Sequence, residues 1–203
     1  MPERRFLKSY KSTYKKRRIN HFEPRQRLLI VCEGEKTEPN YFKKFPIPSD
    51  CVIEVNGIGA NTVSLVKEAI RLRDQADYNY DQVWCVFDRD SFPVNNFNAA
   101  LQMAKAKRIK VAYSNEAFEL WYLLHYCYFN TGLSRKDYKV RLTHYLGHKY
   151  QKNSKTIYDE IYPHQNDAIR YAKKLLSLYT PNPAKDNPST TVHVLVEKLK
   201  RIF

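Results

Sequence analysis

The chain has 203 residues, which suits one domain, and its 35 Lys and Arg against 21 Asp and Glu give a formal net charge of +14 at pH 7. This excess of positive charge favours a polyanionic partner, with nucleic acid ahead of an anionic membrane surface. Scattered cysteines, no apolar run near ~20 residues and no apolar segment behind the basic N-terminus argue against a disulfide framework, a membrane span and a signal peptide. We therefore expect a cytoplasmic protein.

Residues 1–26 form a basic arm, in which aromatic side chains stand between the cations and apolar periodicity is weak. We predict that this arm is flexible when free. On nucleic acid its cations would contact phosphates and its rings would stack on bases, whereas the alternative is a solubilising tail. Residues 27–203 are predicted to form one domain. The arm residues that we assign to nucleic acid are Lys15, Lys16, Arg17 and Arg18.

From residue 28 onward, short apolar runs alternate with connections long enough for a helix. Such alternation predicts a parallel sheet with helices on its faces. Strands are predicted at 28–32, 51–55, 83–87 and 109–113, and helices at 39–45, 62–76, 97–107 and 116–129, the last capped by Ser114 or Asn115.

Beyond residue 130 the pattern becomes helical, with helices predicted at 136–146, 166–178 and 191–202. The segment 179–188 contains three prolines and is predicted to be a loop, after which Ser189 or Thr190 would cap the last helix. The predicted fold is therefore an α/β domain with a parallel sheet and a helical C-terminal elaboration.

Asp88 and Asp90 stand two residues apart, directly after the apolar run WCVF. Residues i and i+2 of an extended chain project to the same side, so the two carboxylates would repel each other. A divalent cation removes that repulsion, and Mg²⁺ and Mn²⁺ prefer oxygen ligands. The pair predicts a Mg²⁺ or Mn²⁺ site, against the plainer alternative of a polar turn.

Glu33 follows the apolar run LLIVC, and Gly34 lets the backbone turn sharply there. Ligands of parallel sheets bind at the carboxyl ends of the strands, where we expect Glu33 to approach Asp88. Glu33 would bind metal or transfer a proton, and Lys36 would contact a phosphate oxygen. Glu35 is the alternative key glutamate, and a solvated acidic loop is the plainer interpretation. The run GEKT is no P-loop, because the earlier glycine of that motif is absent.

Glu119 lies within the apolar segment EAFELWYLLHYCYF. A carboxylate there stands either on the one wet face of a helix or at a functional site. We predict that it completes the metal shell or anchors a second ion. Asn115, one helical turn away, and His125 are further candidates, although a histidine in such a run is more often a hydrogen-bonded core residue.

Four motifs in this order resemble the RloB family over nearly the whole chain from about residue 28: EGEKTE, DRD, SNEAFELWYLLH and NPSTTV. That family is associated with a Toprim-type domain and with bacterial loci of phage defence or restriction. The resemblance implies a small parallel sheet flanked by helices and Mg²⁺-dependent chemistry at a phosphodiester. It matches Glu33 to the Toprim glutamate, Asp88 and Asp90 to its D-x-D pair, and Glu119 to the family's acidic position in F-E-x-W-x-L-L-H.

The resulting hypothesis is a metal-dependent endonuclease that cuts RNA or DNA as an effector of phage defence by abortive infection. Glu33, Asp88 and Asp90 would hold Mg²⁺ or Mn²⁺, with Glu119 also catalytic, and Arg89 would join Lys36 on the nucleic-acid backbone. An ATPase encoded nearby is a further expected partner. The rivals are a binding module that docks nucleic acid or the ATPase without cutting, and a nucleotidyl or phosphoryl transferase.

Overall fold

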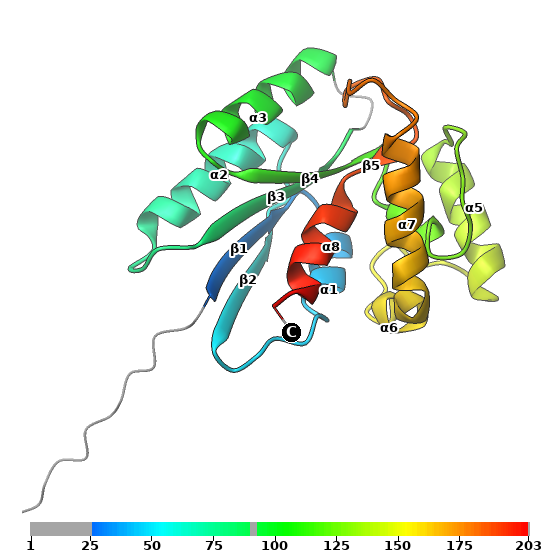
Figure 1. Ribbon diagram of the computed structural model, residues 1–203, viewed down its shortest axis with the longest axis horizontal. Coiled ribbons are helices and arrows are strands. Elements are labelled where there is room, and N and C mark those ends of the chain that lie inside the picture. The colour runs from blue at the N-terminus through cyan, green and yellow to red at the C-terminus, as the bar shows by residue number, and fades with distance from the viewer. Residues whose placement is uncertain (1–25, 90–92, 203) are drawn as a thin grey trace, which may run out of the picture.

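The computed structural model describes residues 26–89 and 93–202 (Figure 1). Its centre is a five-stranded sheet in the order β2-β1-β3-β4-β5. The first four strands are parallel, as predicted, and the short β5 runs antiparallel to β4. The strands are β1 (Gln26–Cys32), β2 (Cys51–Gly57), β3 (Gln82–Asp88), β4 (Lys110–Asn115) and β5 (Ser189–Thr190).

Helices cover both faces of this sheet, and the C-terminal part of the described chain is mainly helical, which confirms the predicted α/β class. The described residues contain no helix that is both long and apolar enough for a membrane span. The helices are α1 (Thr37–Phe42), α2 (Thr62–Gln75), α3 (Val94–Ala106), α4 (Glu119–Leu123), α5 (Arg135–Leu146), α6 (Ile157–Ile161), the 3-10 helix η1 (Tyr162–His164), α7 (Gln165–Leu176) and α8 (Val192–Lys200).

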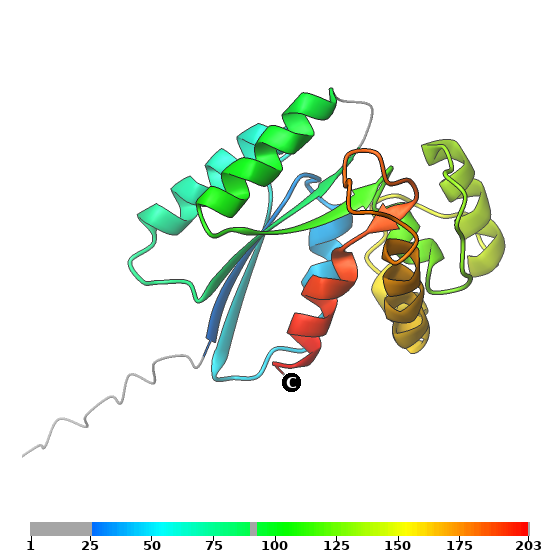
Figure 2. The ribbon, with the colours of Figure 1, turned by 45° about the horizontal axis from the view of Figure 1, so that its top comes forward.

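The alternation of side chains along β1 explains its continuous apolar run. Leu28 and Ile30 belong to one hydrophobic core, whereas Leu29 and Val31 belong to the other, and all four are fully buried. The second core lies under α2 and α3, which pack side by side on one face (Figure 2). The first core lies under α1 and the C-terminal helices. Because β1 is buried on both faces, helices must cover the sheet on each side.

The prediction of a long helix at 116–129 is wrong. Strand β4 continues through Ser114 and Asn115, which pair with β5, so neither residue is free to cap a helix. Only Glu119–Leu123 is α-helical, and the chain leaves the helix before Tyr126–Phe129. Aromatic residues have modest helix propensity, and these rings pack sideways against α5 and α7 instead.

The sequence patterns did not reveal three further elements, β5, α6 and η1. Ser189 and Thr190, expected to cap the last helix, form β5, where the Thr190 hydroxyl donates to the Tyr113 carbonyl at 3.0 Å. Helix α6 and η1 precede α7 without a long apolar stripe to reveal them. Helices α5, α7 and α8 and the loop at 179–188 lie where they were predicted. Helix α1 begins at Thr37, two residues before the predicted start.

Candidate active site

The ends of β1 and β3 bring Glu33 and Asp88 together. These strands are parallel neighbours, with Cys32 paired to Val86. The pairing continues past β1, since the Glu33 amide donates to the Val86 carbonyl at 2.8 Å. The Glu33 side chain then folds toward β3, and its Oε2 accepts a hydrogen bond from the Asp88 amide at 3.1 Å. The juxtaposition expected at the carboxyl edge of the sheet is therefore present.

A third carboxylate, Glu38, was missed as a site residue in the sequence. It lies in the first turn of α1 and is only 6% exposed. A Cβ built on Gly34 would lie 2.1 Å from Glu38 Oε2, so the glycine makes room for this carboxylate. The available signal was Glu38's place on a short helix directly after the strand end, where α1 turns it back toward Glu33.

Glu119 supplies a fourth carboxylate from the start of α4. It is 5% exposed, and the Tyr150 hydroxyl donates to its Oε1 at 3.3 Å. Tyr150 belongs to the connection between α5 and α6, residues 147–156, which we call the strap. Segments from four parts of the chain thus converge on one acidic cluster, made by Glu33, Glu38, Asp88 and Glu119.

The acidic cluster is electrostatically strained. Burial raises the pKa of Asp88 well above its ordinary value, and repulsion from Glu38 and Glu119 adds to this shift. The Arg135 guanidinium, 3.6 Å from Asp88 Oδ2, opposes the shift without cancelling it. Burial also raises the pKa of Glu38, and Glu119 again repels it. The cluster therefore carries more negative potential than its neighbours balance.

Two oxygens of this cluster, Asp88 Oδ1 and Glu38 Oε2, are shielded from solvent, and no hydrogen-bond donor of the described residues reaches them. Buried polar atoms are nearly always paired, so such oxygens call for an explanation. A hard divalent cation would satisfy both and offset the repulsion, so the donor chemistry fits Mg²⁺ or Mn²⁺. However, across residues 26–89 and 93–202 no three His, Cys, Asp or Glu side chains are arranged to hold a metal ion as they stand.

The strap lies against α1 beside the acidic cluster. The Thr37 hydroxyl donates to the Lys152 carbonyl at 2.8 Å, and Asn40 Nδ2 donates to the Asn153 carbonyl at 3.1 Å. Between α1 and the strap is a cavity of about 330 Å³, whose lining includes the exposed side chains of Lys36 and Lys152. Lys152 lies close enough to Glu38 to lower its pKa. The cavity therefore brings two cations together, with Lys152 close to Glu38, an arrangement that suits a phosphate group.

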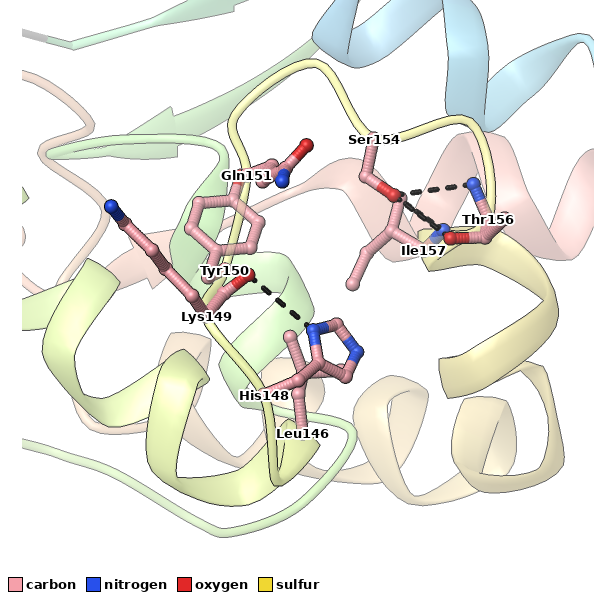
Figure 3. A pocket seen from close by; sticks show the side chains of 8 residues that line it. All are labelled: Leu146, His148, Lys149, Tyr150, Gln151, Ser154, Thr156 and Ile157. Carbon is pink, nitrogen blue, oxygen red and sulfur yellow. Dashed lines mark hydrogen bonds between the residues drawn. The ribbon is translucent and has the colours of Figure 1, made fainter.

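Figure 3 shows a second, smaller cavity of about 180 Å³, which the strap itself lines. His148 Nε2 lies 2.7 Å from Glu160 Oε2, whereas His144 packs its ring against Tyr145. These two histidines thus have separate partners. The Ser154 hydroxyl accepts hydrogen bonds from the amides of Thr156 and Ile157, so the strap is shaped by its own contacts.

A comparison with protein families shows to which family this chain belongs. The model of the RloB-like proteins matches residues 28–199, which is most of its length. The chain belongs to the RloB-like family. The resemblance in the four sequence motifs is thereby confirmed. No match was found among curated proteins or among solved structures.

Other site residues predicted for this RloB-like chain lie apart from the acidic cluster or outside the described residues. Glu35 is exposed and points at Gly59, where an added Cβ would lie 2.7 Å from its Oε1, so Glu33 and not Glu35 reaches Asp88. Asp90 and the arm residues Lys15, Lys16, Arg17 and Arg18 lie outside the described residues.

Three further candidates have structural partners. Arg89 Nε donates to the Ala184 carbonyl at 3.1 Å, and Asn115 Nδ2 donates to the Asp186 carbonyl at 2.8 Å. Both therefore hold the 179–188 loop of the RloB-like fold against the end of the sheet. His125 is buried, and its Nδ1 lies 2.9 Å from the carbonyl of Trp121, whose ring it also contacts. This is the placement of a core histidine.

Proposed function

We propose that this RloB-like protein is a metal-dependent endonuclease, with a Toprim-type acidic site made by Glu33, Glu38, Asp88 and Glu119. The observation that carries the proposal is a pair of shielded oxygens, Asp88 Oδ1 and Glu38 Oε2, which no hydrogen-bond donor of residues 26–89 and 93–202 reaches, within a mutually repelling cluster. The rest of the chain is strongly basic, so a polyanionic substrate would be drawn to a site that needs a cation.

Each residue of the site would have its own role. Asp88 and Glu38 would hold Mg²⁺ or Mn²⁺, which when bound would activate water and neutralise charge on the scissile phosphate. Glu33, held by the Asp88 amide, is placed to orient this pair or to accept a proton. Lys36 and Lys152 would hold phosphates beside the cluster. A role in phage defence, with an ATPase as partner, is the biological part of the same proposal.

The direct test is incubation of the protein with total cellular RNA and with plasmid DNA, in Mg²⁺, Mn²⁺ or EDTA. We expect metal-dependent cleavage, with a fall of at least about 10²-fold for Asp88→Asn, in line with the loss of a group that stabilises the transition state. A matched control is Asp167→Asn, which changes an exposed ion pair on α7. Cleavage of equal rate by Asp88→Asn would contradict the assignment.

A binding module without cleavage is the second candidate. The observation in its favour is that no three metal-ligating side chains within 26–89 and 93–202 are arranged around a common point. Under this alternative neither RNA nor DNA is cut in any metal, although binding to nucleic acid persists. Product analysis separates a transferase: new 5′-phosphate ends indicate hydrolysis, whereas extended or labelled products indicate transfer.

A further inference from the structure

Aromatic rings and cations gather around residues 126–129, in the C-terminal helical part. Figures 1 and 2 show α5 and α7 in the same helical part of the molecule, and residues 126–129 follow α4 and contact both helices. We call this surface the aromatic platform, and it comprises Tyr126, Tyr128, Phe129, Arg141, Tyr145, Tyr171 and Lys174.

The platform rings are partly exposed, and those outside α5 also pack against the first hydrophobic core. Tyr126 and Tyr145 stack with their centroids 5.4 Å apart and their planes at 10°, and Tyr145 is 39% exposed. Tyr128 lies 5.7 Å from Tyr171. Large flat rings that remain accessible at a surface can accept a further ring, and every nucleobase has a suitable face.

Two platform cations stand beside these rings. The Lys174 ammonium lies 4.1 Å above the Tyr128 ring, and the Arg141 guanidinium lies 4.6 Å above Phe129. Both side chains are exposed, and neither has a carboxylate ion-pair partner among the described residues. Arg141 and Tyr145 are four residues apart on α5 and so share a helix face. On this face the cation could contact a phosphate while the ring stacks on the neighbouring base.

We infer that the aromatic platform binds single-stranded nucleic acid, with unpaired bases on its tyrosines and phosphates on Arg141 and Lys174. This inference rests on the proposed nuclease function, for which it names the substrate class. Bases inside a duplex are stacked on each other and cannot reach the rings, so unpaired strands are selected. Helix α5 also begins at Arg135, beside Asp88, so one helix joins the platform to the acidic cluster.

The test is fluorescence anisotropy with fluorescein-labelled oligouridine, oligothymidine and a duplex of equal length. It uses the full chain carrying Asp88→Asn in EDTA, so that cleavage plays no part. We expect preference for the single strands. Tyr145→Leu should weaken single-strand binding roughly tenfold, in line with ~1–3 kcal/mol per stacked base. Arg141→Gln with Lys174→Gln should lower the slope of log K against log salt by about 1.4.

The matched control is Lys67→Gln with Lys105→Gln, which removes two exposed cations from α2 and α3 on the other face of the sheet. It should change affinity less than about twofold. Equal loss in both double variants would overturn the inference, because binding would then follow net charge alone. Unchanged affinity in the platform variants, with melting temperatures unaltered, would also overturn it and leave the surface to a protein partner. Preference for single strands in this test, together with no cleavage of RNA or DNA by the wild type in Mg²⁺ or Mn²⁺, would refute only the nuclease proposal.

Discussion

At the scale of single residues, Asp88 is a carboxylate that its surroundings do not satisfy. Its Oδ1 is shielded from solvent and has no hydrogen-bond partner in the part of the chain that the structure describes, and Glu38 and Glu119 repel its charge. Proteins keep such groups at functional sites, where a bound ligand makes the interaction that the folded protein leaves unmade. The same reasoning applies to Glu38. Helix α1 brings Glu38 into the acidic cluster, whereas Asp88 stands at the end of a strand.

Asp88→Asn should therefore stabilise the protein in EDTA. Asn cannot ionise, so the variant loses the repulsion from Glu38 and Glu119, and we expect its melting temperature in EDTA to exceed that of the wild type. Added Mg²⁺ should raise the melting temperature of the wild type more than that of the variant, because the variant lacks one of the two carboxylates that would hold the ion. Thermal unfolding in both conditions measures this. A less stable variant in EDTA would show that Asp88 is already satisfied.

Gly34→Ala should displace the Glu38 carboxylate, since the new Cβ would lie 2.1 Å from Oε2. We expect cleavage to fall by at least about tenfold, because small displacements of catalytic groups are costly. Gly132→Ala serves as the control, because its Cβ would approach only the side chain of Asn187, at 3.1 Å. Full activity in Gly34→Ala would mean that the position of Glu38 does not matter.

At the scale of elements, the part of the site that lies at strand ends could be predicted from the sequence. Apolar runs that stop at Glu33 and Asp88 indicate buried parallel strands, and parallel neighbours bring such ends together. Glu38 and Tyr150 could not be found in this way, because α1 and the strap reach the site through tertiary contacts. The prediction of a helix at 116–129 was wrong for a similar reason. Pairing with β5 holds Asn115 in the sheet, and the local sequence pattern does not reveal that pairing.

Thr37→Val should loosen the strap. It removes the hydroxyl that donates to the Lys152 carbonyl at 2.8 Å, at a cost of about 1 kcal/mol. Hydrogen exchange at the amides of 150–154 should become faster, and cleavage should decrease as Tyr150 and Lys152 lose their positions. Ser177→Ala, which removes an exposed hydroxyl that donates to the Lys174 carbonyl at the end of α7, should leave these amides nearly unchanged. Equal protection in Thr37→Val would show that the strap holds itself.

At the scale of the whole molecule, global stability should depend on the buried His125. Burial lowers its pKa to about 3, whereas in the unfolded chain it titrates near 6.5. The unfolded state therefore binds an extra proton below about pH 6.5, and stability falls as pH decreases toward about 3. One such group gives a slope of about 1.4 kcal/mol per pH unit.

Replacement His125→Gln should reduce that slope by up to this amount, whatever its effect on absolute stability. Urea unfolding at pH values between about 4 and 8 measures the slope. The exposed His144, replaced in the same way, is the control. An unchanged slope in His125→Gln would show that the imidazole is protonated in the folded protein.

The central claim is that the acidic cluster takes up a divalent cation. Equilibrium binding of Mn²⁺, monitored by the loss of its free electron-paramagnetic signal, tests this without a substrate. We predict saturable binding by the wild type, at least about tenfold weakened in Asp88→Asn and in Glu38→Gln and unchanged in Asp167→Asn. Equal Mn²⁺ affinity in all four proteins, or none in the wild type, would contradict the claim.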